Sequence, residues 1–146
     1  MSFNRLVYDD GHFYGGYYST CKLQNNQTVA IYFFRNQTSR GYEYNVAFAI
    51  ANKRKHIKNW LKGEGGDVLS NKSTGRCGLD GLIWAKQQIM EFEKFIISPF
   101  YRSQEVIICV GWADNRRRDV YEHYLKRIGY KMGYRDGSKC LFKKVA

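Results

Sequence analysis

STGRCGLDGLIWAKQQI at residues 73–89 and EVIICVGWADNRRRDVYEHYLKRIGY at residues 105–130 decide the fold of this chain. The first stretch is a glycine-bearing loop that runs into an amphipathic helix, and the second is an apolar strand, a turn and a basic helix. This order of elements can place an anionic ligand at the end of a sheet, because a helix N-terminus offers unpaired N–H groups and a positive dipole end.

The helix of the first stretch is predicted to begin near Gly78 and to end before Pro99. Apolar residues recur in it at three- and four-residue steps and predict a single buried stripe. The members of this stripe are Leu79, Leu82, Ile83, Ile89, Met90, Phe92 and Ile96.

The second stretch begins with an apolar run at residues 105–113, which predicts a strand in the middle of a sheet. Asp114 or Asn115 is a suitable N-cap for the helix that follows. Gly129 is a natural C-terminal glycine, so this helix is expected to end near residue 128.

The first third of the chain has the composition of strands. Residues 14–23, 28–35 and 42–51 are rich in β-branched and aromatic residues and are separated by polar turns. Along the third of these strands, large apolar residues stand at every second position. One of its faces is therefore expected to carry Tyr44, Val46, Phe48 and Ile50.

The remaining elements complete an α+β fold. A short helix is expected at residues 53–62, and residues 131–134 and 139–145 predict a closing hairpin. The order is then β-β-β-(α)-α-β-α-β-β, which indicates a mixed, mostly antiparallel sheet flanked by helices. At 146 residues, the chain is expected to form a single domain over residues 1–146.

Charge is the strongest compositional signal. The chain has 24 Lys and Arg against 13 Asp and Glu, a net charge of +11, with clusters at residues 53–62, 116–118 and 124–131. Such clusters predict an acidic partner, which can be nucleic acid, a phosphorylated cofactor or an acidic protein surface. A merely solubilising surface is the alternative.

Cysteine usage argues against a metal site and for a cytoplasmic protein. Cys21, Cys77, Cys109 and Cys140 are widely spaced and include no C-x-x-C pair, so a zinc site is not expected. Cys109 lies inside the apolar run and is expected to pack as a small buried hydrophobe. The N-terminal MSFNRLVYDDGH lacks the apolar core of a secretory signal, and no stretch is apolar enough to span a membrane.

The second half of the chain resembles the GNAT superfamily of acyl-CoA-dependent N-acyltransferases. The likeness covers residues 72–130, with a pyrophosphate loop and helix, a strand, an Asn-containing turn, a Tyr-bearing helix and a Gly-aromatic pair. The closing hairpin, which ends in CLFKKV, also fits. The resemblance implies a GNAT-like fold and the transfer of an acetyl group from acetyl-CoA to an amine of a protein or small molecule.

The family's pyrophosphate pattern is Gln/Arg-x-x-Gly-x-Gly/Ala, and KSTGRC at residues 72–77 matches it with Lys and Cys in the outer positions. A register shifted to Gly78 places Asp80 in the last position. Glycine suits this loop because it lets the backbone approach the phosphates closely. The acetyl-CoA-binding residues that the resemblance implies are Lys72, Thr74, Gly75, Arg76, Cys77, Gly78, Leu79 and Asn115.

In the family, a tyrosine before the Gly-aromatic pair acts as general acid toward the leaving thiolate. Tyr124 lies five residues before Gly129 and is implied in this role, and Tyr121 is the other candidate, one turn earlier. A phenol suits the task because its pKa of about 10 keeps it protonated at neutral pH. Core packing is the alternative for either tyrosine. The general base stays open among Glu43, His56, Glu64 and Asp67.

Three functions from different classes therefore remain open. The first is the acyltransferase. The second is a nucleic-acid-binding module, which is favoured by the net charge and by the aromatic and basic residues interleaved at 118–135. The third is a non-catalytic protein, such as an inactive relative of the family or an inhibitor that binds an acidic partner.

Overall fold

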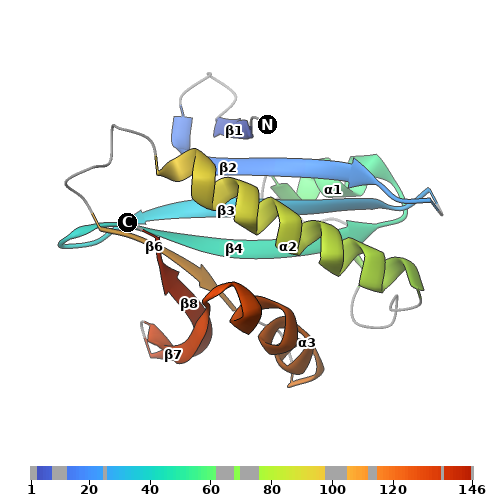
Figure 1. Ribbon diagram of the computed structural model, residues 1–146. Helices are drawn as coiled ribbons and strands as arrows, with labels where there is room; N and C mark the ends of the chain where they lie inside the picture. Colours follow the sequence, from blue (N-terminus) through green and yellow to red (C-terminus); the bar gives the residue numbers. More distant parts are fainter. Residues whose placement is uncertain are drawn as a thin grey trace. The chain divides into compact units, whose positions relative to one another are not determined.

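The computed structural model describes residues 3–7, 13–24, 26–61, 68–69, 76–97, 105–111, 115–135 and 137–145. These residues form an α+β fold with three α-helices and a mixed, mostly antiparallel sheet (Figure 1). Seven strands follow one another in the order β1-β2-β3-β4-β6-β8-β7, and a short eighth strand, β5, pairs with β4. The predicted fold class is confirmed.

The bounds of the elements agree closely with the sequence pattern. The strands are β1 (Asn4–Val7), β2 (Phe13–Lys22), β3 (Thr28–Gln37), β4 (Gly41–Ala51), β5 (Val68–Leu69), β6 (Glu105–Val110), β7 (Lys131–Arg135) and β8 (Ser138–Lys144). The helices are α1 (Arg54–Leu61), α2 (Arg76–Ile96) and α3 (Asn115–Leu125), and a 3-10 turn, η2 (Lys126–Ile128), follows α3. β1 and β5 are additions to the predicted order. None of the described helices is long and apolar enough to cross a membrane.

The chain divides into two compact units. The first consists of Met1–Tyr32 and Phe48–Met90, and the second of Phe33–Ala47 and Glu91–Ala146. Long elements such as β3, β4 and α2 contribute residues to both units. The expectation of one domain over residues 1–146 stays a prediction.

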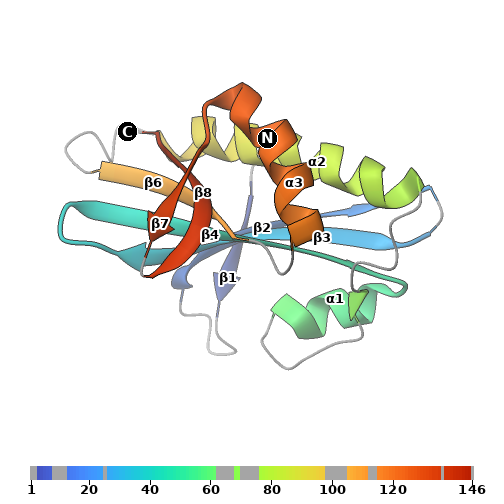
Figure 2. The ribbon, with the colours of Figure 1, turned by 90° about the horizontal axis from the view of Figure 1, so that it is seen from below.

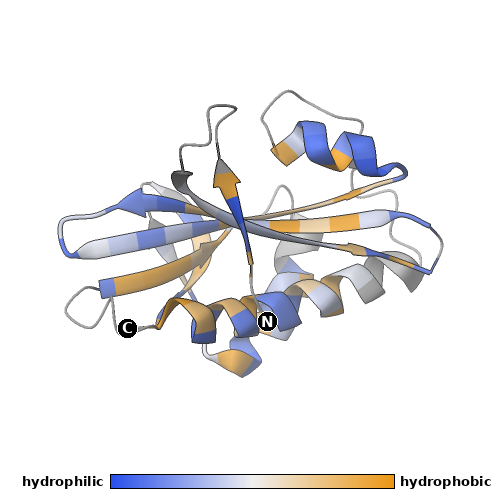
Figure 3. Ribbon diagram, turned by 90° about the horizontal axis from the view of Figure 1, so that it is seen from above, coloured by the Kyte–Doolittle hydropathy of each residue, from blue (hydrophilic) through white to orange (hydrophobic). Residues whose placement is uncertain are grey.

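In the first unit, α1 packs through one apolar stripe. Figure 3 shows this helix as mostly hydrophilic, with apolar residues at intervals. Trp60 of α1 meets the ring of Tyr32 edge on, with ring centroids 5.0 Å apart. The buried cluster between helix and strands consists of Ile57 of α1 and of Ala30, Ala49 and Ala51 on the strands. Small alanines on the strands therefore let a short, otherwise polar helix lie close to the sheet.

In the second unit, β6 pairs with β4 in parallel and with β8 in the antiparallel direction, and β7 completes a hairpin with β8 (Figure 2). The core of this unit is aromatic where α2 meets β3 and β4. Phe92 of α2 stacks on Phe33 with centroids 3.9 Å apart and meets Tyr44 edge on at 5.0 Å. The residues of β6 after Glu105 are buried, as the apolar run predicts.

The predicted apolar stripe of α2 is partly wrong. Ile89, Phe92 and Ile96 are buried as expected, but Ile83 and Met90 are 40% and 37% exposed. The reason lies in small residues that the stripe omitted. A Cβ at Gly81 would lie 3.3 Å from the side chains of Phe48 and Ile50, so the helix touches β4 through its glycine side. The buried side chains described on α2 are Ala85, Gln88, Ile89, Phe92 and Ile96.

Candidate functional site

The parallel pair β4–β6 is the feature of the sheet that positions a candidate site. Its ladder ends at Val46 and Val110, while β4 runs on to Ala51. The side chains at positions 45–48 are half-buried, whereas those at 49–51 are buried. Strand β4 is thus less covered where its pairing with β6 stops. In sheets with parallel strands, ligands bind outside the carboxyl ends of those strands.

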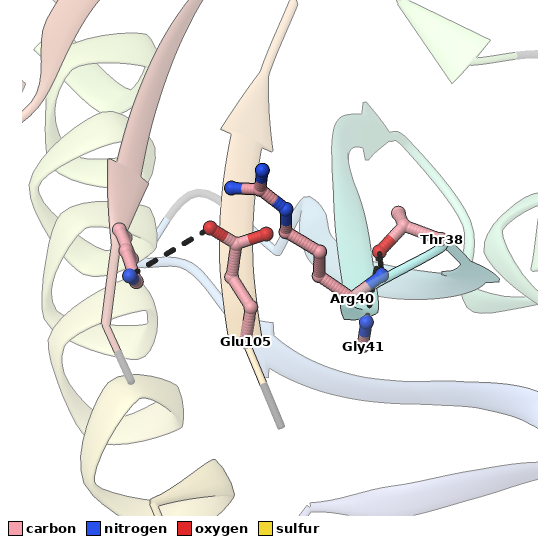
Figure 4. A network of polar contacts seen from close by, with 5 residues as sticks. Thr38, Arg40, Gly41 and Glu105 are labelled. Atoms are coloured by element: carbon pink, nitrogen blue, oxygen red, sulfur yellow. Dashed lines mark hydrogen bonds and ion pairs between the residues drawn. The ribbon is translucent and has the colours of Figure 1, made fainter. Parts of the chain in front are cut away.

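Gly41 fixes the other end of this pair. A Cβ at Gly41 would overlap the backbone of Glu105, lying 2.6 Å from its nitrogen and 2.8 Å from its carbonyl carbon. The Glu105 N–H donates to the carbonyl oxygen of Arg40 at 3.0 Å. The Gly41 N–H donates to Thr38 Oγ1 at 3.0 Å, as Figure 4 shows. The Glu105 carboxylate also lies 3.7 Å from the Lys144 ammonium. The close approach sets the register, and with it the position of the two carboxyl ends.

Helix α3 follows β6 in the chain and carries both predicted catalytic tyrosines. Tyr121 and Tyr124 lie one turn apart, and each is half-buried, so part of each side chain reaches solvent. The ring of His123 meets that of Tyr124 edge on, with centroids 5.1 Å apart. His123 itself is exposed. The helix begins at Asn115, so the structure brings Asn115, Tyr121 and Tyr124 onto one element.

The predicted cofactor loop falls largely outside the described residues. Lys72, Thr74 and Gly75 lie in that part of the chain. The residues from Arg76 to Leu79 form the first turn of α2 in the first unit, while Asn115 and the two tyrosines belong to the second. For Arg76, Cys77, Gly78, Leu79 and Asn115, the structure describes the backbone and not the side chains. The loop does run into a helix, which begins two residues before the predicted Gly78.

Among the candidate bases, Glu43 is the one that lies on the parallel pair. It is only 4% exposed and sits opposite Ile107 of β6. His56 is half-buried on α1, in the first unit. Glu64 and Asp67 lie outside the described residues. A carboxylate next to the β4–β6 ladder can accept a proton from an amine bound at the carboxyl ends only if that amine comes within hydrogen-bond reach.

A charged cluster that sequence reasoning missed joins α2, η2 and β8. The Lys143 ammonium lies 3.0 Å from Glu93 Oε1 and donates to the carbonyl oxygen of Ile128 at 2.8 Å. It also lies 5.8 Å from the ring centroid of Tyr130, which is 2% exposed. Burial raises the pKa of the Tyr130 phenol, and the negative charge of Glu93 raises it further. Tyr130 therefore stays protonated and cannot serve as a base.

The cluster combines one hydrogen bond, from Lys143 to the Ile128 carbonyl, with an ion pair between Lys143 and Glu93. Within the described part of the chain, neither the Tyr130 hydroxyl nor Glu93 Oε1 has a well-aligned hydrogen bond. The attraction between Glu93 and Lys143 is therefore that of an ion pair. Gly129, with φ of +99°, turns the chain beneath the Lys143 stem. In the sequence, only the Gly129-Tyr130 pair pointed to this cluster, because Glu93 and Lys143 lie far from it along the chain.

A shallow cavity of about 370 Å³ lies beside Tyr130. Its volume is at the lower end of the range of about 300–1,000 Å³ that is typical of small-ligand sites. Two of its lining residues are lysines, which suits an anionic group. The lining consists of Lys126, Gly129, Tyr130, Lys131 and Met132.

No group of three or more His, Cys, Asp or Glu side chains in the described ranges could hold a metal ion. Cys109 is buried, which confirms its predicted packing role. Its Sγ lies 2.8 Å from that of Cys140, which is buried on the neighbouring strand β8. These two thiols therefore belong to the core of the second unit.

Comparisons with protein-family models, curated proteins and solved structures found no match to this chain. A function is therefore inferred from the residues and the geometry of the chain itself.

Proposed function

We propose that the protein is an N-acyltransferase that transfers an acetyl group from acetyl-CoA to an amine. The observation that carries the proposal is the parallel pair β4–β6, whose ladder stops at Val46 and Val110 while β4 continues. Such an opening at the carboxyl ends of two parallel strands is where an open sheet binds a ligand. A parallel pair in a mostly antiparallel sheet, with α1 and α2 between its strands in the chain, is also compatible with the resemblance drawn from residues 72–130.

In this proposal, the amino end of α2 binds the pyrophosphate of acetyl-CoA. The first turn of a helix offers unpaired N–H groups and a positive dipole end. Lys72 and Arg76 add positive charge around that position in the sequence, and Gly75 leaves room for close approach of the phosphates. Asn115, at the start of α3, is assigned to the thioester end of the cofactor.

The chemistry is a direct transfer. The amine nitrogen attacks the thioester carbonyl carbon, the carbon–sulfur bond breaks, and the thiolate leaves. The backbone N–H groups of β4 between Val46, where its pairing with β6 ends, and Ile50, where its pairing with β5 begins, are candidates to hold the oxyanion. Tyr124 gives its proton to the thiolate, with Tyr121 as the alternative donor. Glu43 is the candidate base for the proton that the amine loses.

The proposal is tested by measuring release of CoA by mass spectrometry when the full chain is mixed with acetyl-CoA and candidate amines. The panel should include lysine-containing acidic peptides, since the chain carries a net charge of +11 and attracts acidic partners. Tyr124→Phe should lower kcat by about 10²- to 10⁴-fold and leave the KM for acetyl-CoA nearly unchanged, because the phenol proton is needed only in the transition state.

Tyr121→Phe is the matched control, since it removes a hydroxyl from the same helix one turn away. If it lowers kcat while Tyr124→Phe does not, the donor is Tyr121. Full activity in both variants would exclude a tyrosine of α3 as the acid. Acetyl-CoA binding without turnover of any amine would identify an inactive relative of an acyltransferase.

A further inference from the structure

We propose that the β7–β8 hairpin and the turn before it form a binding surface for single-stranded nucleic acid, centred on Tyr134. Tyr134 is 72% exposed, more than any other large hydrophobic side chain in the described part of the chain. It lies on β7, the last strand in the sheet order, and no other described strand pairs with the outer edge of β7. An exposed aromatic ring on an accessible edge is suited to stacking against a base.

Basic side chains lie next to this ring. Lys139 is directly opposite Tyr134 across the hairpin, and directly opposed residues have Cβ atoms about 4.5–5.5 Å apart. Arg127, on the preceding turn, is also exposed, as is Lys131, which is three residues before Tyr134 and therefore on the other face of β7. A base that stacks on Tyr134 therefore has a flanking phosphate within reach of Lys139, and a strand that follows the edge of β7 can meet Lys131 from the other face.

The segment that contains the hairpin and the turn before it is strongly basic. Residues 126–144 hold seven Lys and Arg and one Asp, a net charge of +6 out of the +11 of the whole chain. Acidic side chains neutralise some of these, since Lys126, Lys143 and Lys144 form ion pairs with Glu122, Glu93 and Glu105. No ion pair joins Arg127, Lys131 or Lys139 to another described residue, so their charges remain available to a partner.

The shallow cavity extends the surface along the strand. Lys131 and Met132 line it, and Tyr134 follows Met132 by two residues, about 7 Å along an extended strand. A nucleic-acid strand lying along this edge can thus place a phosphate at the lysines of the cavity and a base on the Tyr134 ring.

The exposed ring favours nucleic acid over an acidic protein. Lysines alone would attract either partner, but every base has a flat π-face that can cover an aromatic ring. It favours a single strand over a duplex, because the bases of a duplex are stacked on one another and show only their edges in the grooves. The surface uses none of the residues assigned to acyl transfer, so the two proposals can be tested independently of each other.

The test is fluorescence anisotropy of the full chain with a labelled oligothymidine of about 12 nucleotides and with a duplex of the same length, over a series of salt concentrations. The single strand should bind more tightly than the duplex. Tyr134→Ala should weaken its binding by about 5- to 150-fold, the loss expected for one stacked base. Tyr134→Phe, which keeps the ring, should bind like the unchanged protein.

A matched pair of double variants separates this surface from general charge. Lys131→Gln with Lys139→Gln should reduce the slope of log affinity against log salt by up to about 1.4, the value for two phosphate contacts to a single strand. Lys55→Gln with Lys58→Gln removes the same charge from exposed positions of α1 and should leave slope and affinity nearly unchanged. Circular dichroism should show every variant folded, since all the changed side chains are exposed.

Three results would overturn the proposal. The first is equal loss of affinity in the two double variants, which would indicate attraction by net charge alone. The second is binding that does not respond to Tyr134→Ala. The third is competition by polyglutamate as effective as that by unlabelled oligothymidine, which would assign the surface to an acidic protein.

Discussion

Gly41→Ala tests the close approach of β4 and β6, because the added methyl group has no room. Its carbon would lie 2.6 Å and 2.8 Å from two backbone atoms of Glu105 and still closer to the carbonyl oxygen. Carbon atoms in contact normally lie about 3.5–4.0 Å from their neighbours, so one strand must shift by about 1 Å. Backbone atoms of a paired strand cannot rotate away as the end of a side chain would.

The expected loss of stability can be estimated from two contributions. Forcing an extra methyl group into a packed site costs about 1–3 kcal/mol. The shift also breaks the bond from the Glu105 N–H to the Arg40 carbonyl, 3.0 Å long, which contributes about 0.5–1.5 kcal/mol. The free energy of unfolding should therefore fall by about 2–4 kcal/mol, and Tm by about 4–16 °C for a chain of this size.

Urea and thermal unfolding followed by circular dichroism measure this loss. Gly111→Ala is the matched control, since a Cβ there meets no atom within 4 Å, and its stability should stay within about 0.5 kcal/mol of the unchanged protein. A Gly41→Ala protein as stable as its Gly111→Ala counterpart would refute the reasoning, because the two strands would then not approach as closely as described.

The charged cluster gives two further predictions. Lys143→Met leaves the Glu93 carboxylate, whose side chain is 13% exposed, without its cation, and should lower the free energy of unfolding by about 2–4 kcal/mol. Glu93→Gln in the same chain should restore part of this loss. A double-mutant cycle measured in urea that shows no coupling between the two positions would contradict the ion pair. Stability should also fall as the pH rises above about 10, since the unfolded chain then releases the phenol proton that buried Tyr130 retains. Tyr130→Phe should lessen that dependence by up to about 1.4 kcal/mol per pH unit. A free energy of unfolding that falls equally steeply with pH in both proteins would disprove this role of Tyr130.

The sequence predicted those elements whose signal is local. The apolar run of β6, the glycine that ends η2 and the closing hairpin each depend on a few adjacent residues, and the structure confirms them. The stripe of α2 was only partly predicted, because large apolar residues were counted while Gly81 and Ala85 mark the side that touches the sheet. β1 and β5 are short, with four and two residues, and carry too few positions to show a period.

What the sequence could not show depends on contacts between distant residues. The parallel pairing of β4 with β6, and the absence of room at Gly41, follow from a crossover through α2. The Glu93–Lys143–Tyr130 cluster likewise joins three elements, and no spacing along the chain reveals it. On α3, the pattern did place Asn115, Tyr121 and Tyr124 on one helix, since four residues make about one turn.

The most direct test of the proposed acyltransferase is thermal unfolding of the protein with and without acetyl-CoA. At a hundred times its dissociation constant, a ligand adds about 2.7 kcal/mol, which corresponds to a rise in Tm of about 5–11 °C. Gly111 lies exposed at the carboxyl end of β6 with open space around it, so Gly111→Trp is expected to fold and to obstruct the site, while Gly111→Ala does not. We predict that acetyl-CoA raises the Tm of the unchanged and Gly111→Ala proteins but not that of Gly111→Trp. The absence of any rise in the unchanged protein at millimolar acetyl-CoA would contradict an acyl-CoA site at the β4–β6 pair.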